Sequence, residues 1–232
     1  MSKTNTAATY LLALEKVFSK AGNVLRAQGA AQYMRNQFEY FGIQTDERRR
    51  IGKQFIKTNP APEGTELETL IRLLWKQDKR EYQYFGMELL QSRIKQGEKV
   101  RVNLIEYMIQ HKSWWDTVDF IAPTIAGGLL MNEPELLERT AVKWMKSDNL
   151  WLKRSAILIQ LKYKKRTNNR LLFSMILKSA NETDFFIRKA IGWSLRQYGK
   201  TNPEGVKDFV HDNEASLSGL SKREALRIIN KS

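Results

Sequence analysis

The sequence contains no cysteine and only two histidines, His111 and His211. Without cysteine the chain cannot form a disulfide, use a thiol nucleophile or bind zinc or an iron–sulfur cluster through thiolates. Two histidines so far apart in the chain also argue against a histidine metal cluster. We therefore predict neither a metal nor a cofactor.

Long apolar runs are missing as well. No stretch of 18 apolar residues offers a membrane span, and the first residues lack the pattern of a signal peptide. We expect a soluble, cytoplasmic protein. Its 232 residues, 42% of them hydrophobic, are enough to bury a sizeable core in one large domain or two small ones.

Acidic residues are scarce relative to basic ones: 25 Asp and Glu stand against 39 Lys and Arg, a net charge of +14. The excess runs along the whole chain, with 17 basic and 11 acidic residues in 1–100 and 22 and 14 in 101–232. The segment 149–181 has eight basic residues and no acid. Such a local field attracts polyanions, so we favour a nucleic acid partner, with an anionic membrane or an RNA-rich assembly as alternatives.

Strand signals are absent too, because no alternating apolar run is bounded by Asn-Gly or Asp-Gly turns. Apolar residues instead recur at helical spacing, for example over residues 10–18 and 67–74. The pattern predicts an all-α fold.

The expected helix starts recur at a regular interval. Good N-cap residues precede helical stretches at Thr45, Asp78, Ser113, Asn149, Asp184 and Ser221, at intervals of 33, 35, 36, 35 and 37 residues. Several carry an acid three residues on that is typical of a capping box, namely Glu81, Asp116 and Glu224. Second helices lie between these starts, as Asn202-Pro203 indicates.

Two helices in about 35 residues are typical of an α-solenoid. The tetratricopeptide consensus is not visible, so the spacing favours about six HEAT-like helical repeats with a concave, basic face, in a single domain over residues 1–232. The alternative is an irregular helical bundle. Aligning the caps makes Trp115, Trp151 and Phe186 equivalent, as well as Arg154 and Lys189. One face would thus collect aromatic and cationic side chains, which suits a groove that follows a phosphate backbone.

The segment SWWDTVD contains the first candidate site. With Ser113 as cap, Trp115 and Asp119 are four residues apart and share one helix face. Asp119 lies in an apolar stretch and needs an explanation: either an ion pair with a neighbouring helix, for which Arg154 is a candidate, or catalysis. Trp114 points elsewhere and is interpreted as core.

The second candidate site is the predicted helix FFIRKAIGWSLR. Phe186, Lys189, Trp193 and Arg196 form one stripe, which is either the edge of the core or a binding surface. Gly192 inside a helix costs about 1 kcal/mol relative to Ala. Either a ligand approaches the backbone there or a helix packs densely against it.

Several strings, KSWWDTVD, SDNLWLKRSAILIQLKYK, FFIRKAIGWSLRQY, YFGIQTDERR and LSKREAL, closely resemble the AlkD-type DNA glycosylases, HEAT-like repeat enzymes of alkylation repair. The resemblance runs from about Gln32 to Leu226 and implies excision of 3-methyladenine and 7-methylguanine from duplex DNA. A monomer is our default expectation. The resemblance also implies catalytic roles for Asp119, Trp115 and Trp193, and DNA contacts at Tyr33, Gln44, Thr45, Arg154, Phe185 and Phe186. To these the basic segment and the aromatic–cationic stripe add Lys162, Lys189 and Arg196.

This chemistry fits the residues present. A cationic alkylated purine leaves as a neutral base, so no general acid is required, and one carboxylate stabilises the developing sugar cation. Asp119 suits that role, and the two indoles offer electron-rich surfaces to cations. We expect base excision that leaves an abasic site, in a cytoplasmic protein associated with the bacterial nucleoid when bound to DNA. Two alternatives remain: a non-catalytic solenoid that binds damaged or branched DNA, and a scaffold for an acidic protein.

Overall fold

The computed structural model describes residues 6–95 and 100–229. These residues form helices and loops, and the one strand-like feature among them is an isolated parallel bridge between Glu39 and Lys79. The prediction of an all-α fold is confirmed. Within the described residues, no helix combines the length and the apolar character that crossing a membrane demands.

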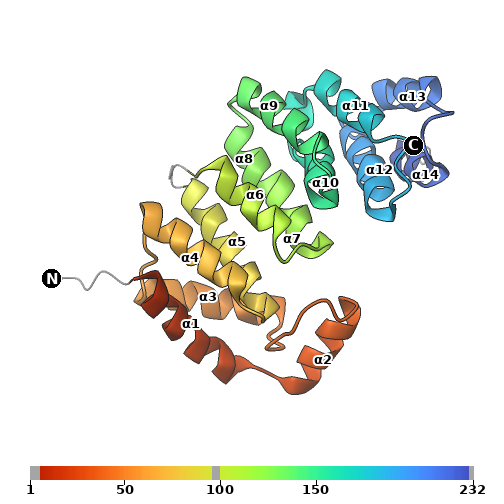
Figure 1. Ribbon diagram of the computed structural model, residues 1–232. Coiled ribbons are helices and arrows are strands. Elements are labelled where there is room, and N and C mark those ends of the chain that lie inside the picture. The colour runs from red at the N-terminus through yellow and green to blue at the C-terminus, as the bar shows by residue number, and fades with distance from the viewer. Residues whose placement is uncertain (1–5, 96–99, 230–232) are drawn as a thin grey trace. The chain divides into compact units, whose positions relative to one another are not determined.

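The helices group into two compact units, the first ending at Val100 and the second beginning at Arg101. The expectation of a single domain over 1–232 stays a prediction. The first unit (red to yellow in Figure 1) contains α1 (Ala7–Ala21), α2 (Val24–Tyr33), α3 (Thr45–Thr58), α4 (Gly64–Lys76) and α5 (Arg80–Lys95).

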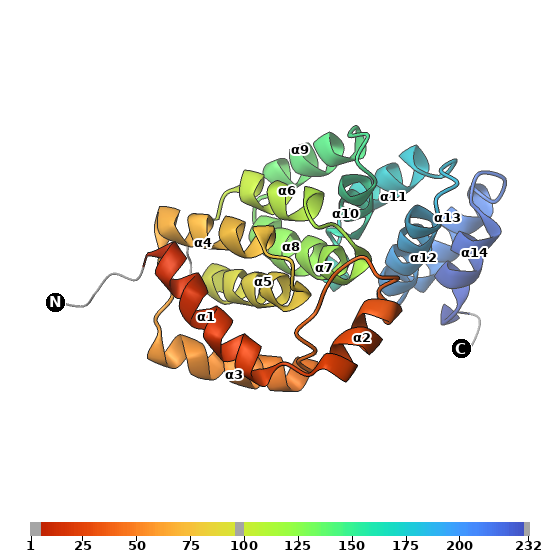
Figure 2. The ribbon, with the colours of Figure 1, turned by 60° about the horizontal axis from the view of Figure 1, so that its bottom comes forward.

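The core of the first unit is organised around α1. Its apolar stripe, Tyr10, Leu14 and Phe18, is fully buried, and the helix lies between α3 and α4 (Figure 2). The Tyr10 ring meets Phe55 edge-on at 5.0 Å. In contrast, α2 buries none of its residues.

The second unit is built from short helices in sequence order. It comprises α6 (Val102–Gln110), α7 (Trp115–Phe120), the π-helical turn η1 (Ile121–Ala126), α8 (Gly127–Leu130), α9 (Pro134–Met145), α10 (Leu150–Leu158), the 3-10 turn η2 (Lys164–Arg166), α11 (Asn169–Lys178), α12 (Phe185–Gly199), α13 (Pro203–Asp212) and α14 (Gly219–Leu226). Because α7, η1 and α8 follow one another without a break, they form one continuous helical segment.

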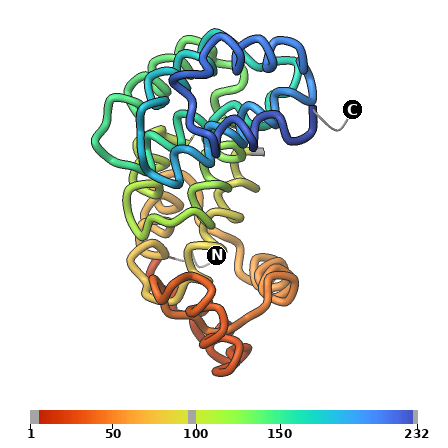
Figure 3. The backbone as a smooth tube through the Cα atoms, turned by 90° about the vertical axis from the view of Figure 1, so that its right-hand side faces the viewer, coloured from red at the N-terminus to blue at the C-terminus, as the bar shows by residue number. Residues whose placement is uncertain are grey.

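These helices form two rows. In the inner row, α7 contacts α10, α10 contacts α12, and α12 packs extensively on α14. The outer row contains α6, α9, α11 and α13, each packed on members of the inner row or on its neighbours in the outer row. Figure 3 shows the same helices (green to blue) as successive hairpins. The prediction of repeated helix pairs is thus confirmed in this unit.

Three of the predicted helix starts are confirmed by their caps. The Asn149 side chain accepts from the amides of Trp151 and Leu152, and Asp184 does the same one repeat later. The side chain of Asn202 accepts from Gly205 N, with a proline at the start of α13. Cap chemistry is local, so the sequence is sufficient to locate these ends.

Other predicted caps are wrong. Thr45 is the first residue of α3 and follows the cap position at Gln44. The hydroxyl of Ser113 donates to Ile109 O at 2.6 Å, and Trp114 takes the cap position of α7. Ser221 lies inside α14, where its hydroxyl donates to Arg188 O at 3.0 Å, and the cap is Ser218.

Candidate nucleic-acid interface

An ion pair links three inner-row helices of the second unit. Arg154, on α10, donates from Nε and Nη2 to the two carboxylate oxygens of Asp119, on α7, at 2.8 Å each. Its Nη1 donates to the carbonyl oxygen of Phe186, in the first turn of α12. Arg154 is 4% exposed. The arginine therefore ties α7 and α12 together through α10, and the ion-pair interpretation of Asp119 is confirmed.

Two opposing effects act on the Asp119 carboxylate. Burial raises its pKa above the ordinary value of 3.8, whereas the hydrogen bonds and positive charge of Arg154 oppose the rise. A bidentate guanidinium strongly stabilises the ionised form of a carboxylate, so we take Asp119 to be ionised at neutral pH. Its side chain is 19% exposed, so it is partly accessible from the surface.

Aromatic rings cluster at the beginnings of the same three helices. Trp114, Trp151 and Phe186 form a closed cluster, with ring centroids 5.7, 5.3 and 5.0 Å apart. The Arg154 guanidinium lies 5.9 Å from the Phe186 ring. Phe185 stands 5.6 Å from Phe186 and is 57% exposed, so one ring of this group faces solvent.

The cluster differs from the sequence alignment of the repeats. Because α7 begins one residue later than expected, Trp115 occupies the first position of its helix, whereas Trp151 and Phe186 occupy the second. Trp114, which was assigned to the core, is half-buried and makes the contacts expected of Trp115. The sequence signal here is the pair Trp114-Trp115, and it does not show which of the two rings joins the cluster.

The two tryptophans with expected catalytic roles are both half-buried. Trp115 lies one turn before Asp119 on α7, so the ring and the carboxylate share a face of that helix. Trp193 lies two turns after Phe186 on α12, on the same face and roughly 10 Å further along the axis. Asp119, Trp115 and Trp193 thus all belong to the inner row.

The predicted cations on α12 have an acidic partner on α14. Lys189 Nζ lies 2.8 Å from Glu224 Oε1, and Arg196 Nη1 donates to Glu224 Oε2. The sequence pattern predicts a capping-box role for Glu224 and does not predict this pairing. Lys162, exposed beyond the end of α10, donates to Thr124 Oγ1 at 2.7 Å.

The ion pairs follow the repeat. Asp119, Arg154, Lys189 and Glu224 are each 35 residues apart, and they lie on α7, α10, α12 and α14. Asp119 is bonded to Arg154, and Lys189 is bonded to Glu224. We call these four residues the charge ladder. Asp119, Arg154 and Lys189 are each the fifth residue of their helix, and Glu224 is the sixth residue of α14.

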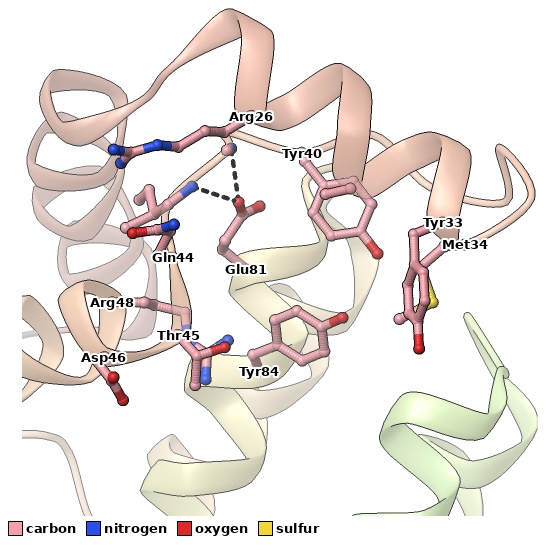
Figure 4. Close-up of a pocket in the computed structure, with 13 residues that line it drawn as sticks. Arg26, Tyr33, Met34, Tyr40, Gln44, Thr45, Asp46, Arg48, Glu81 and Tyr84 are labelled. Carbon is pink, nitrogen blue, oxygen red and sulfur yellow. Dashed lines mark hydrogen bonds between the residues drawn. The ribbon is translucent and has the colours of Figure 1, made fainter.

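The remaining predicted DNA contacts lie in the first unit, around a cavity of about 520 Å³ (Figure 4). Tyr33, Gln44 and Thr45 all line it, and Tyr33 is 72% exposed. Arg48 at the same cavity is buried, pairs with Glu88 at 2.8 Å and lies 4.6 Å from the Tyr84 ring. The structure therefore gathers these three predicted residues at one concave place.

The loop that precedes Gln44 and Thr45 is fixed by a buried acid. Glu81 accepts from the amides of Phe41, Gly42 and Ile43 at 3.0, 2.8 and 3.2 Å. Figure 4 draws the last two of these bonds. Gly42 has φ +84, and an added Cβ would lie 2.1 Å from Asn23 O. The expected capping role of Glu81 thus gives way to a role in holding this loop, which the sequence pattern did not reveal.

The fold and these sites define a helical-repeat protein that presents aromatic, cationic and acidic side chains along one row of helices. The family model of the DNA alkylation repair enzymes matches residues 14–229, and the chain belongs to this family. A solved structure described as a predicted DNA alkylation repair enzyme from Enterococcus faecalis is 31% identical in sequence, with a TM-score of 0.82. The match covers 91% of this chain and 98% of the chain in that structure.

A more distant structure shares the fold alone. It is the smu.31 protein of Streptococcus mutans, 18% identical, with a TM-score of 0.54, over 79% of this chain and 94% of its own. A comparison with curated proteins finds no significant match.

Proposed function

We propose that the protein is a monofunctional alkylpurine DNA glycosylase, which hydrolyses the N-glycosidic bond of cationic 3-methyladenine and 7-methylguanine in duplex DNA and leaves an abasic site. Membership of the DNA alkylation repair enzyme family supports the substrate class. The observation that carries the reaction type is Asp119, a partly exposed carboxylate held in one orientation by Arg154 beside aromatic rings.

The charges of the reaction suit this site. The lesion already bears a positive charge, so the base departs neutral while positive charge develops on the sugar. An ionised carboxylate near that sugar stabilises the developing charge and orients the attacking water. Trp115 and Trp193 add electron-rich ring faces, which favour a cationic substrate over a neutral base. Selectivity then rests on the charge of the lesion.

Arg154 contributes by positioning Asp119. The resemblance implies a DNA contact for this residue, but its Nε, Nη1 and Nη2 atoms are all engaged by Asp119 and Phe186, and it is almost fully buried. We therefore assign phosphate contacts to more exposed groups, among them Lys162 and Lys189. Phe185 is available to a base or sugar face.

Mass detection of free bases tests the proposal. Wild-type protein should release 7-methylguanine and 3-methyladenine from methylated duplex DNA, and Asp119→Asn should release far less while it binds the same duplex with nearly unchanged affinity. The amide keeps the shape of the side chain and removes its charge, so a full rate for Asp119→Asn would contradict the proposed role.

A second candidate function is non-catalytic binding of damaged or branched DNA. The observation that favours it is the engagement of both Asp119 oxygens by one guanidinium, which uses much of the acceptor capacity of the carboxylate. Duplex binding by a wild-type protein that releases no base would establish this function.

A further inference from the structure

A glycine on α12 lets α14 approach closely. A Cβ added to Gly192 would lie 2.4 Å from the Cβ of Glu224 and 3.0 Å from Ser221 O. No side chain larger than hydrogen fits this helix crossing, which explains a glycine that lowers the helix propensity of α12. Of the two interpretations of Gly192, dense packing of a helix is the one the structure shows.

This close crossing places Glu224 between two cations. Lys189 and Arg196 lie seven residues apart on α12, one on each side of Gly192, and each binds one oxygen of the Glu224 carboxylate. The hydrogen bond from Lys189 lowers the pKa of Glu224, so the carboxylate is ionised at neutral pH. The side chains of Lys189, Arg196 and Glu224 remain 38%, 23% and 17% exposed, so all three are partly accessible from solvent.

Within the charge ladder, the Lys189–Glu224 pair has a counterpart in the Asp119–Arg154 pair. Arg154 is buried and bound to both carboxylate oxygens of Asp119, whereas the side chain of Lys189, 35 residues on, is 38% exposed beside its own acid. Ion pairs that are partly open to water are weak, and salt screens them. A contact of this kind is one that a phosphate can displace.

We propose that Glu224 is a positioning residue that competes with the DNA backbone for Lys189 and Arg196. In the free protein its carboxylate orients and partly neutralises both cations, and in the complex they turn to phosphates. Glu224 therefore lowers affinity for any duplex, damaged or not. The inference rests on the DNA-binding part of the proposed function and not on base release.

Affinity for unmodified duplex, measured across a salt series, tests this role. Glu224→Gln should bind roughly threefold to tenfold more tightly at low salt, because two cations lose their competitor, and the slope of log affinity against log salt should steepen by about 1. A purely structural role of Glu224 would not steepen that slope. Unchanged or weaker binding by Glu224→Gln would overturn the proposal.

A matched control separates the local effect from net charge. Glu204→Gln adds the same unit of charge to α13, where Glu204 pairs with Lys207 at 2.9 Å and is exposed. We expect it to change affinity less than twofold. An equal gain in both variants would show that net charge alone acts, and would also overturn the proposal.

A double-mutant cycle adds a test that does not depend on the absolute affinities. Lys189→Met should weaken duplex binding more in the Glu224→Gln background than in wild type, because the lysine is then free of its competitor. Equal losses in the two backgrounds would contradict competition for Lys189. Thermal unfolding of each variant verifies that the fold is retained.

The outcome is separable from that of the glycosylase proposal. Tighter binding by Glu224→Gln together with no base release by wild type would uphold the role of Glu224 and reject the enzyme. Base release without any gain in affinity for Glu224→Gln would do the reverse.

Discussion

Both carboxylate oxygens of Asp119 accept hydrogen bonds from Arg154, at 2.8 Å each, although the two residues are 35 positions apart in the chain. The pair joins α7 to α10, and the carbonyl of Phe186 extends it to α12. Its geometry explains how an acid in an apolar stretch stays charged. It also means that mutation of either partner alters both folding and chemistry, so the two must be measured separately.

Removal of the guanidinium should destabilise the second unit. Arg154→Met leaves Asp119 mostly buried and without its counter-ion, and we expect the free energy of unfolding to fall by about 3 kcal/mol. Urea denaturation followed by circular dichroism measures this loss. The double variant Arg154→Met/Asp119→Leu should recover much of it, because two packed apolar side chains replace a desolvated pair. No recovery would show that the carbonyl of Phe186 is the important partner.

The pH dependence of base release should reflect Asp119. Burial raises its pKa above 3.8, so the carboxylate gains a proton, and the rate falls, at a higher pH than for an exposed aspartate. The same shift favours the folded state at low pH: this contribution to stability is present below the unfolded pKa and is lost as pH rises through the folded one. Single-turnover rates between pH 4 and 8 test the prediction, with DNA alone as the control for spontaneous loss of bases.

The contribution of Glu224 to stability should depend on pH with the opposite sign. Lys189 lowers its pKa below 4.5, so its contribution to stability is present above that value and is lost as pH falls through the lowered pKa. The difference in unfolding free energy between wild type and Glu224→Gln should therefore shrink in acid. A difference that grows on acidification would mean that Lys189 does not stabilise the ionised carboxylate.

Trp193→Ala should reduce release of cationic bases more than it reduces duplex affinity. The indole is half-buried on the same face of α12 as Phe186, where it can meet a positively charged lesion, whereas phosphate contacts depend on exposed cations. Base release and binding are measured on the same methylated duplex. Parallel losses in both would assign Trp193 to general DNA binding. Trp193→Phe serves as the control that keeps an aromatic ring.

The sequence predicts those features that depend on neighbouring residues. Asn149 and Asp184 cap their helices through amides two and three positions away, so the interval between them reveals the repeat. Ser113 and Ser221 fail as caps because their hydroxyls meet other carbonyls, and for Ser221 that carbonyl belongs to Arg188 on another helix. A local pattern contains no information about such a partner.

The same limit applies to the candidate site. The sequence offers Arg154 as a candidate partner for Asp119, and the structure shows this pair. The pairing of Lys189 with Glu224 is hidden from the sequence pattern, because a cap at Ser221 would place Glu224 in the first turn of its helix, whereas α14 begins at Gly219. The three backbone hydrogen bonds of Glu81 are likewise a property of the folded loop.

The two glycines Gly192 and Gly128 should respond to alanine with opposite signs. Both lie in helices of the second unit, but a Cβ at Gly128 meets nothing within 4 Å, whereas one at Gly192 collides with α14. Gly128→Ala should therefore stabilise by up to about 1 kcal/mol, through the better helix propensity of alanine. Gly192→Ala makes the same intrinsic gain, yet overpacking typically costs 1–3 kcal/mol, so we expect a net loss of about 1 kcal/mol or more. Chemical denaturation of the two variants side by side measures both. Stabilisation by Gly192→Ala would mean that α14 yields easily, and that the contact of Glu224 with Lys189 does not depend on a close crossing of the two helices.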